Sequence, residues 1–297
     1  MAQLGFLGLG IMGYPMAGHL LKAGHGVALW THQSHKAVEL AKTGNGTACA
    51  TPREVAERSD FIFYCVGDTR MAQSITVGKN GLIEGIRKDA VVSDCSTIAP
   101  AASIEIGEAF AAKGAHFLDS PVTGSTPGAI NAALTFMIGG DQQAYARAKP
   151  YMEIMGKLFY YCGKAGQGLL AKLTQNLVGA SIMQAFAEGM VLAVKNGIAP
   201  ELMFEILDNS AAKSGLAAFK TPFILKRDFA PRFSTKWMHK DVGLALDSAK
   251  ELDLPLPLTA ITQQMLRAAI AKGWGDDDFV SIIRVLEDWA GVVVQKS

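Results

Sequence analysis

The sequence predicts an α/β fold in which a half of alternating strands and helices is followed by an all-α half, with one long helix joining them. Short apolar runs alternate with helical patterns up to about residue 163, residues 166–196 form one apolar stretch, and no strand pattern returns afterwards. The chain has 297 residues, more than one hydrophobic core usually organises. We therefore expect two domains, residues 1–163 and 164–297.

The first strand leads into a glycine-rich turn. An apolar run over residues 3–8 continues into Gly8-Leu9-Gly10-Ile11-Met12-Gly13, and a helical pattern follows to Lys22. In this strand-to-helix setting, the first glycine permits a tight turn, the second lets the backbone approach a pyrophosphate, and the third lets helix and strand pack closely. A purely structural glycine turn is the alternative. The pattern favours a Rossmann-type domain in which these six residues contact a dinucleotide.

The loop after the second predicted strand, residues 27–30, selects the cofactor in such domains. An acidic side chain there binds the ribose hydroxyls of NAD, whereas basic groups receive the 2′-phosphate of NADP. The loop of this chain has neither acid nor arginine; it reads Thr31-His32-Gln33-Ser34-His35-Lys36. We expect Thr31, His32 and Gln33 to contact the cofactor, with NADP favoured and NAD possible.

Two later strands end in loops that can also contact the cofactor. Residues 61–66 and 90–94 have buried-strand patterns, and the capping box Thr51-Pro52-Arg53-Glu54 opens the helix before the first of them. Ligands bind beyond the carboxyl ends of parallel strands, so the residues that follow are candidate contacts. They are Val66, Gly67, Ser96 and Thr97. Ordinary turn and cap chemistry accounts equally well for any one of them.

Three further strands are predicted at residues 116–122, 134–138 and 157–161. Between the first two lies the loop Thr123-Gly124-Ser125-Thr126-Pro127-Gly128, which is rich in hydroxyl groups and backbone amides. Such a loop can hold a carboxylate. A long surface turn is the alternative.

The apolar stretch of residues 166–196 predicts one helix, roughly 45 Å long at 1.5 Å per residue. Lys172 and Asn176 lie near its start at i,i+4 spacing, so an ammonium group and a carboxamide share one face about a turn apart. The helix should end at Asn196-Gly197, where glycine can adopt the left-handed conformation. A core helix whose lysine reaches out to solvent is the competing interpretation.

Four more helices are predicted, over residues 201–207, 234–252, 258–272 and 278–290. Gly273 would be the C-terminal cap of the helix over 258–272, and Asp276 to Asp278 would supply the N-terminal cap and first-turn acids of the helix over 278–290. By spacing alone, Lys240 belongs to a charged face of the second. Apolar helix surface in excess of one core favours a homodimer or homotetramer.

Composition argues against several functions. The net charge of +1 carries no bias toward nucleic acid. The four cysteines are widely separated and form no C-x-x-C pair, so we expect neither a disulfide nor a zinc site. A metal site at His32 and His35 is not expected either, because no cysteine is near them in the sequence.

The start of the chain and the long apolar stretch favour a cytoplasmic protein. The first residues lack the basic start, apolar middle and small-residue cleavage site of a signal peptide. Polar residues interrupt the one stretch long enough to span a membrane, namely Lys172, Asn176, Gln184 and Glu188. We therefore expect no membrane partner.

Motifs spread over nearly the whole chain resemble the β-hydroxyacid dehydrogenase family, which includes 3-hydroxyisobutyrate dehydrogenase, tartronate semialdehyde reductase and succinic semialdehyde reductase. The motifs are the glycine turn with Pro15-Met16-Ala17, the runs Asp94-Cys95-Ser96-Thr97 and Asp119-Ser120-Pro121-Val122-Thr123-Gly124, the spacing Gly168-x-x-x-Lys172-x-x-x-Asn176, and Lys240-Asp241. Their order and intervals together are more specific than any one of them.

The resemblance implies hydride transfer between NAD(P)H and a small 3-hydroxy acid or semialdehyde. It implies that Lys172 is the general acid/base and that Asn176 orients the substrate. It also implies that the Thr123-Gly124 segment binds the substrate carboxylate. Ser96 would contact both substrate and cofactor, and Phe233 and Lys240 would contact the cofactor. An ammonium group suits this reaction, since negative charge builds on the carbonyl oxygen during reduction.

The chain departs from the family pattern in two loops. One is the loop of residues 123–128, which is expected to bind the substrate carboxylate. The other is the loop of residues 31–36, which is expected to contact the ribose of the cofactor and is called the ribose loop below. Thr123 stands where serine is usual, and Ser125 and Ala132 stand where glycine is common. Thr31-His32 replaces the Asn-Arg pair of many NADP-preferring members. Substrate identity and the choice between NADP and NAD therefore stay open.

Two other functions compete with this one. An imine reductase of the same fold would be expected to carry a different proton donor at the position of Lys172. A non-catalytic dinucleotide-binding scaffold would bind the cofactor without turnover, and would be expected to lack that lysine. Fold alone does not decide between them.

Overall fold

The protein is described by a computed structural model over residues 3–296, and it divides into two compact units between Lys172 and Leu173. This division falls inside helix α8, Gln167–Lys195. The boundary predicted at residues 163 and 164 lies just before that helix, at the end of strand β9, Gly156–Gly163. As a division between cofactor-binding and substrate-binding functions, it stays a prediction.

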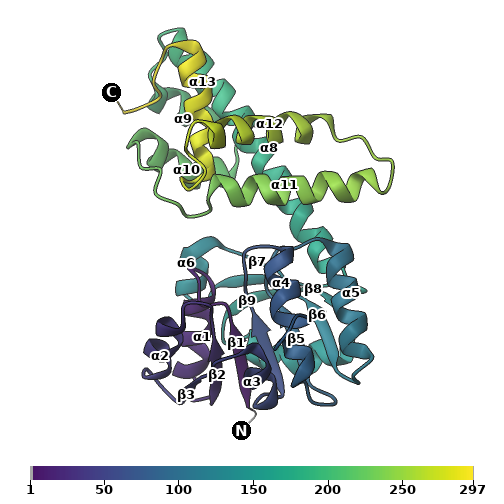
Figure 1. Cartoon of the computed structure of the whole chain (residues 1–297). Helices are drawn as coiled ribbons and strands as arrows, with labels where there is room; N and C mark the ends of the chain where they lie inside the picture. The colour runs from purple at the N-terminus through teal and green to yellow at the C-terminus, as the bar shows by residue number, and fades with distance from the viewer. Residues whose placement is uncertain (1–2, 297) are drawn as a thin grey trace. The chain divides into compact units, whose positions relative to one another are not determined.

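The first unit is built on one sheet of nine strands, as far as the described residues show (Figure 1). Six parallel strands lie in the order β3-β2-β1-β4-β5-β6; β8 follows antiparallel to β6, with β7 antiparallel and β9 parallel to it. Successive strands are added first on one side of β1 and then on the other, which is the Rossmann order. The remaining strands are β1 Leu4–Leu7, β2 Val27–Trp30, β3 Gly46–Ala48, β4 Phe61–Tyr64, β5 Val91–Asp94, β6 His116–Asp119, β7 Val122–Thr123 and β8 Leu134–Gly140.

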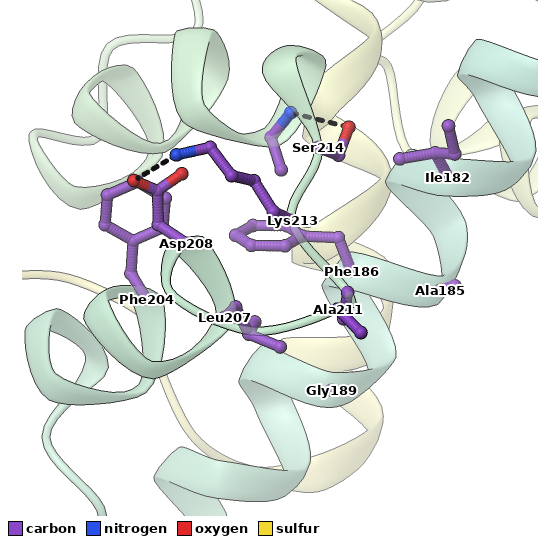
Figure 2. A pocket seen from close by; sticks show the side chains of 12 residues that line it. Ile182, Ala185, Phe186, Gly189, Phe204, Leu207, Asp208, Ala211, Lys213 and Ser214 are labelled. Carbon is purple, nitrogen blue, oxygen red and sulfur yellow. Dashed lines mark hydrogen bonds and ion pairs between the residues drawn. The ribbon is translucent and has the colours of Figure 1, made fainter.

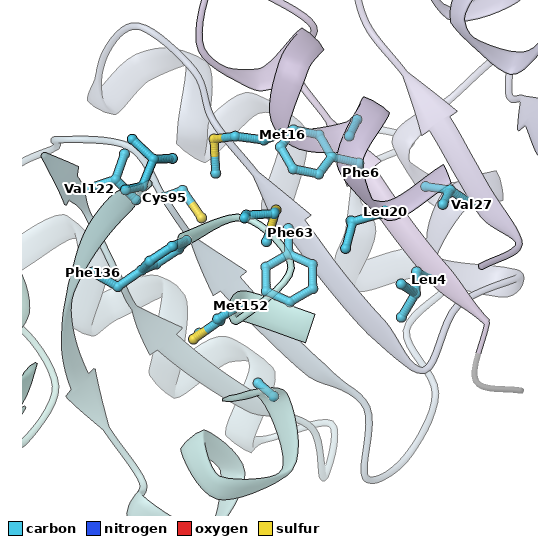
Figure 3. Packing of buried hydrophobic residues seen from close by; sticks show 14 of the residues in the cluster. Leu4, Phe6, Met16, Leu20, Val27, Phe63, Cys95, Val122, Phe136 and Met152 are labelled. Carbon is cyan, nitrogen blue, oxygen red and sulfur yellow. The ribbon is translucent and has the colours of Figure 1, made fainter. Parts of the chain in front are cut away.

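Helices cover both faces of this sheet. Because neighbouring strand residues point to opposite faces, Phe6 and Phe63 belong to one hydrophobic cluster, whereas Leu7 and Tyr64 belong to another. Figure 3 shows Phe6 and Phe63 packed with Met16 and Leu20 of α1 in the first cluster. The helices of this unit are α1 Gly13–Lys22, α2 Ser34–Ala41, α3 Pro52–Glu57, α4 Thr69–Thr76, α5 Pro100–Ala111, α6 Ser125–Ile130 and α7 Gln142–Met152.

The second unit is helical, as predicted. After α8 come α9 Pro200–Asp208, α10 Gly215–Leu225, α11 Thr235–Lys250, α12 Pro257–Ala271 and α13 Ile282–Ala290, with a 3₁₀ turn over Phe279–Ser281. The helix predicted over 278–290 is thus split into that turn and α13. Helix α10 was not predicted, since its sequence is mostly apolar and contains Pro222.

Helix α8 confirms the prediction of one long helix. It spans 29 residues, and Gly197 beyond its end has a φ of 83°, the left-handed conformation expected there. By length and composition α8 is apolar enough to cross a membrane, but half of its most apolar window is buried within the protein. A core helix of a soluble protein has these properties.

Three local predictions are corrected by the structure. The strand predicted over 116–122 is broken into β6 and β7 at Ser120-Pro121, because proline has no N–H to donate to a sheet. Residues 34–36, predicted as loop, form the first turn of α2. In the capping box, Thr51 accepts from the Glu54 amide at 3.2 Å, but the Glu54 carboxylate accepts from the amide of Ala50.

Two of the departures from the family pattern lie at strained backbone positions. Ser125 and Ala132 have φ values of 55° and 50°, in the left-handed region that favours glycine. A residue with a Cβ costs about 1–2 kcal/mol there, and glycine avoids this cost, although the greater flexibility of glycine in the unfolded chain offsets part of the gain. We expect Ala132→Gly to raise the free energy of unfolding by about 0.5–1 kcal/mol in chemical denaturation. Ala133→Gly is the control, because Ala133 is not left-handed and the change should destabilise. Equal destabilisation by both variants would contradict the assignment of strain.

Candidate active site

The carboxyl ends of the central strands form one row. The register pairs Leu7 with Trp30 and Tyr64, Tyr64 with Asp94, and Asp94 with Asp119. The loops predicted to contact the cofactor start directly after these residues, so they lie along the same edge of the sheet. Ligands bind at this edge in doubly wound folds, at the point where the strand order reverses.

The glycine turn has the geometry that a pyrophosphate requires. Gly8 has a φ of 85°, and a Cβ on it would lie 2.2 Å from the carbonyl oxygen of Cys65. A Cβ on Gly13 would lie 1.9 Å from the carbonyl oxygen of Gly8. By contrast, a Cβ on Gly10 would meet nothing within 4 Å. The first and third glycines therefore fix the turn, and the second leaves open space above it.

Helix α1 presents its N-terminal amides at this turn. Met12 at its N-cap makes no side-chain cap hydrogen bond, and the first turn contains no acidic residue. Both features suit an anion, since the N-terminus of a helix carries partial positive charge. Leu9 is buried in the core and Ile11 is 63% exposed, so Leu9 can contribute only its backbone to a ligand.

The ribose loop leads into a second helix N-terminus. The side chain of Thr31 is buried, whereas His32 and Gln33 are exposed. Gln33 occupies the N-cap of α2 without a side-chain cap hydrogen bond, and the first turn of α2 contains no acid. This loop thus offers hydroxyl, imidazole and amide groups to a ligand.

The loops after β4 and β5 are joined by a hydrogen bond. The amide of Val66 donates to Oγ of Ser96 at 2.9 Å, and the amide of Ser96 donates to Oδ1 of Asp94 at 2.7 Å. Ser96 is buried, while Gly67 and Thr97 are partly exposed. The Ser96 side chain therefore holds the two loops together, and its role as a ligand contact stays a prediction.

Asp94 makes the stability of this edge sensitive to pH. Burial raises its pKa to about 7, although hydrogen bonds from Ser96 and Tyr64 oppose the rise. Between about pH 4 and 7 the folded state therefore binds a proton that the unfolded state has lost, so this carboxyl lowers stability as pH rises.

We expect the unfolding free energy of the wild type, relative to Asp94→Asn, to fall by on the order of 4 kcal/mol across that range. Denaturant titrations at several pH values measure it, and a constant difference would contradict it.

The predicted carboxylate-binding loop begins at the end of β7. Thr123 is the last residue of β7, and Gly124 has a φ of 129° before the short helix α6 begins at Ser125. Gly124 is exposed and Thr123 is half-buried. The turn therefore presents a hydroxyl group and backbone near the surface, as binding a small carboxylate would require.

Lys172 and Asn176 are both buried on α8. Lys172 is 8% exposed and Asn176 is 3% exposed, and one helical turn separates them. The competing interpretation, a lysine that reaches bulk solvent from an apolar face, does not fit this burial.

In the second unit, Asn176 belongs to a polar chain. Its Nδ2 donates to Oδ2 of Asp241 at 2.6 Å, and Oδ1 of Asp241 lies 2.9 Å from Nζ of Lys240. Asp241 is 2% exposed. Since a carboxylate can only accept, it fixes which side of the carboxamide faces it. The sequence prediction gave no role to Asp241, although its place beside Lys240 in a family motif was a signal.

Phe233 is held by a buried ion pair, also in the second unit. Asp278 accepts a hydrogen bond from the Phe233 amide at 3.1 Å and contacts Nζ of Lys220 at 2.7 Å. Both partners of that pair are buried. The cofactor contacts predicted for Phe233 and Lys240 stay predictions.

A pocket of about 290 Å³ lies elsewhere in the second unit, between α8, α9 and α10 (Figure 2). Its wall is mainly apolar, and an ion pair between Asp208 and Lys213, 3.3 Å apart, lies at its side. None of the predicted site residues lines it. Its apolar character does not suit a small hydroxy acid.

Comparisons with known proteins decide the family. One family model, the NAD binding domain of 6-phosphogluconate dehydrogenase, matches residues 3–163. A second, the NAD-binding domain of NADP-dependent 3-hydroxyisobutyrate dehydrogenase, matches residues 166–286. The 2-(hydroxymethyl)glutarate dehydrogenase of Eubacterium barkeri is 35% identical over 98% of this chain and 97% of its own. The chain belongs to the β-hydroxyacid dehydrogenase family.

Further relatives agree with this assignment. The 2-hydroxy-3-oxopropionate reductase of Escherichia coli K12 is 34% identical over 96% of this chain and 97% of its own. A solved structure of Mycobacterium tuberculosis 3-hydroxyisobutyrate dehydrogenase with L-serine has a TM-score of 0.89 and 30% identity, covering 96% of this chain and 99% of that one. As a β-hydroxyacid dehydrogenase, this chain is an NAD(P)-dependent oxidoreductase that acts on a hydroxy acid, as the resemblance implied.

Proposed function

We propose that this β-hydroxyacid dehydrogenase interconverts a small semialdehyde and its 3-hydroxy acid with NADP(H), and that Lys172 is the general acid/base. The observation that carries the proposal is the burial of Lys172 one turn from Asn176 on α8. The names of the relatives support the substrate class, since they are dehydrogenases or reductases of small hydroxy and oxo acids.

The first unit fits the dinucleotide. Gly10 leaves space for the pyrophosphate, and α1 begins at this turn with no acidic residue in its first turn, so its positive N-terminal end favours an anion. Val66 and Thr97 follow the neighbouring strands and lie where the rest of the dinucleotide would extend. When bound, the nicotinamide ring supplies or accepts the hydride.

Lys172 would carry the proton. In the reductive direction its ammonium group donates a hydrogen bond to the carbonyl oxygen, stabilises the negative charge that builds there, and then gives up a proton to it. In the oxidative direction the neutral amine accepts the proton of the hydroxyl group. Asn176 would orient the same oxygen, because Asp241 holds its carboxamide in one direction.

The carboxylate of the substrate would bind to Thr123 and Gly124. A hydroxyl group and backbone amides are donors that a carboxylate accepts from. The threonine methyl group and the Cβ of Ser125 make this loop bulkier than one with serine and glycine. We therefore favour a short substrate, with few carbons beyond the carboxylate.

NADP is the proposed cofactor. The ribose loop has no carboxylate that would repel a 2′-phosphate, and the first turn of α2 holds His35 and Lys36. An anion is favourable at that helix N-terminus. NAD stays possible, because residues 31–36 contain no arginine that could bind the phosphate in a bidentate way.

The two alternatives are less well supported. An imine reductase would be expected to carry a different proton donor at position 172, and a scaffold would have no need of a buried lysine there. The names of relatives at 34–35% identity describe dehydrogenation or reduction of hydroxy or oxo acids. The hydroxyacid reaction is therefore better supported than imine reduction or a non-catalytic scaffold.

The test is the initial rate of nicotinamide oxidation by the purified protein with glyoxylate, succinic semialdehyde and tartronate semialdehyde, each with NADPH and NADH. We expect turnover with at least one aldehyde, and a higher rate with NADPH. Faster turnover with NADH would contradict the cofactor choice. Tight cofactor binding without turnover on these aldehydes or on a wider carbonyl panel would contradict the reaction.

We also propose a cytoplasmic homodimer or homotetramer. The second unit exposes large apolar side chains on α8, α9, α12 and α13, and association between copies would remove them from water. They are Val178, Leu192, Leu202, Ile206, Leu258, Ile261 and Trp289. Light scattering of the protein over a dilution series measures its mass, and a monomer at every concentration would contradict the proposal.

A further inference from the structure

Asp119 is buried at the end of β6, and the proposed chemistry gives its side chain no role, although Thr123 and Gly124 later in the same motif have one. It is 1% exposed, and each of its carboxylate oxygens accepts from a different backbone amide. The amide of Gly166 donates to Oδ1 at 2.8 Å, and the amide of Leu169 donates to Oδ2 at 2.9 Å. Gly166 immediately precedes α8, and Leu169 lies in the first turn of this helix, which carries Lys172.

This carboxylate serves as the N-terminal cap of α8. The first amides of a helix lack partners within it, and the first turn of α8 contains no acidic residue. Asp119 supplies the acceptor and the favourable negative charge from a strand 47 to 50 residues earlier. Most helices are capped by a neighbouring residue. A cap from a distant strand ties the helix to the sheet.

Two glycines allow the helix and the sheet to approach closely at this cap. A Cβ on Gly168 would lie 2.4 Å from the carbonyl oxygen of Met137 and 2.7 Å from that of Asp119. A Cβ on Gly139 would lie 2.6 Å from Oδ1 of Asp119. These contacts are backbone or buried carboxylate, so no side-chain movement could accommodate a larger residue. The start of α8 therefore has one position against β6 and β8.

We propose that Asp119 is a positioning residue, which fixes the first turn of α8 and thereby places Lys172 at the carboxyl edge of the sheet. Lys172 lies three residues after Leu169, within one turn of the anchored amides. A displacement of about 1 Å in a group that must meet a reacting atom can cost about 100-fold in rate. The inference rests on the proposed role of Lys172 as the general acid/base.

Asp119→Asn tests the proposal with little change in volume. An asparagine keeps one acceptor oxygen but turns an NH₂ group toward the other amide, so one of the two hydrogen bonds is lost. We expect kcat to fall at least about tenfold, while the Kd for NADPH, measured by fluorescence titration, changes less than about threefold. Asp141→Ala is the matched control, because Asp141 caps α7 through the Ala144 amide at 2.7 Å and α7 carries no predicted site residue. Its kcat should stay at the wild-type value.

Hydrogen exchange separates this inference from the proposed function. We expect the amides of residues 166–169 to exchange faster in Asp119→Asn than in the wild type, whether or not a substrate has been found. Wild-type exchange there, or wild-type kcat in a folded variant, would overturn the positioning role. A wild-type enzyme without turnover on any carbonyl would instead refute the proposed function and leave the exchange result standing. If Asp119→Asn does not fold, Gly168→Ala takes its place, since its Cβ displaces the same turn.

Discussion

Replacing Lys172 with alanine is expected to lower turnover by about 10² to 10⁴, the range for losing a general acid/base. The side chain is buried on α8, so a lysine on the protein surface cannot donate a proton at the position that the Lys172 ammonium group occupies. The glycine turn and the cofactor loops are formed by other segments, so the Kd for NADPH should stay near the wild-type value. Steady-state kinetics and a fluorescence titration measure the two quantities.

Two further measurements make this result specific. Lys195→Ala removes an exposed lysine from the last turn of the same helix, and it should leave turnover unchanged. Added methylamine should restore part of the activity of Lys172→Ala, because it can occupy the space of the missing ammonium group and supply a proton. Turnover of Lys172→Ala at the wild-type rate would remove this lysine from the mechanism.

Much of the fold could be predicted because its signals are local. The turn of Gly8 to Gly13 is fixed by the need for small residues at two crowded positions, and it is visible in six consecutive letters. Helix α8 was predicted within one residue at each end, since its apolar length and the glycine at 197 are also local features. Local chemistry is what a single sequence records best.

The parts that were missed depend on partners far apart in the chain. Asp119 caps a helix that begins about fifty residues later, and Asp241 binds Asn176 from 65 residues away. Neither pairing leaves a periodic pattern, because each needs the tertiary fold to bring the groups together. Helix α10 was missed for a related reason: its sequence is mostly apolar and carries Pro222, and its one lysine, Lys220, is paired with the distant Asp278, so only its packing shows that it is a helix.

The family motifs mix two kinds of residue that sequence alone does not separate. In Gly168-x-x-x-Lys172-x-x-x-Asn176, the lysine and the asparagine have side chains that can act on a substrate, whereas the glycine is required by the backbone contact with Met137. Ser96 also has a backbone-holding role, because its hydroxyl group accepts a hydrogen bond from the Val66 amide. Structure is needed to divide a motif into groups that do chemistry and groups that hold the backbone.

Gly13→Ala is expected to weaken NADPH binding by at least about 100-fold. The new Cβ would lie 1.9 Å from the carbonyl oxygen of Gly8, so the turn and the start of α1 must move apart. This movement displaces the backbone turn at which we propose that the pyrophosphate binds, and about 2.7 kcal/mol of lost binding corresponds to the expected factor of 100. Isothermal titration with NADPH measures the affinity, and circular dichroism reports whether the variant is folded.

The same helix supplies the matched control. A Cβ on Gly18 would come no closer than 3.9 Å to any atom outside its own turn, the nearest being Cδ1 of Leu40. Alanine is the better helix former, so Gly18→Ala should bind NADPH normally and be more stable by up to about 1 kcal/mol. Equal affinity in Gly13→Ala and Gly18→Ala would mean that the close packing of α1 on the turn does not set the cofactor site. The phosphate would then have to be bound by the loops after β2, β4 and β5 alone.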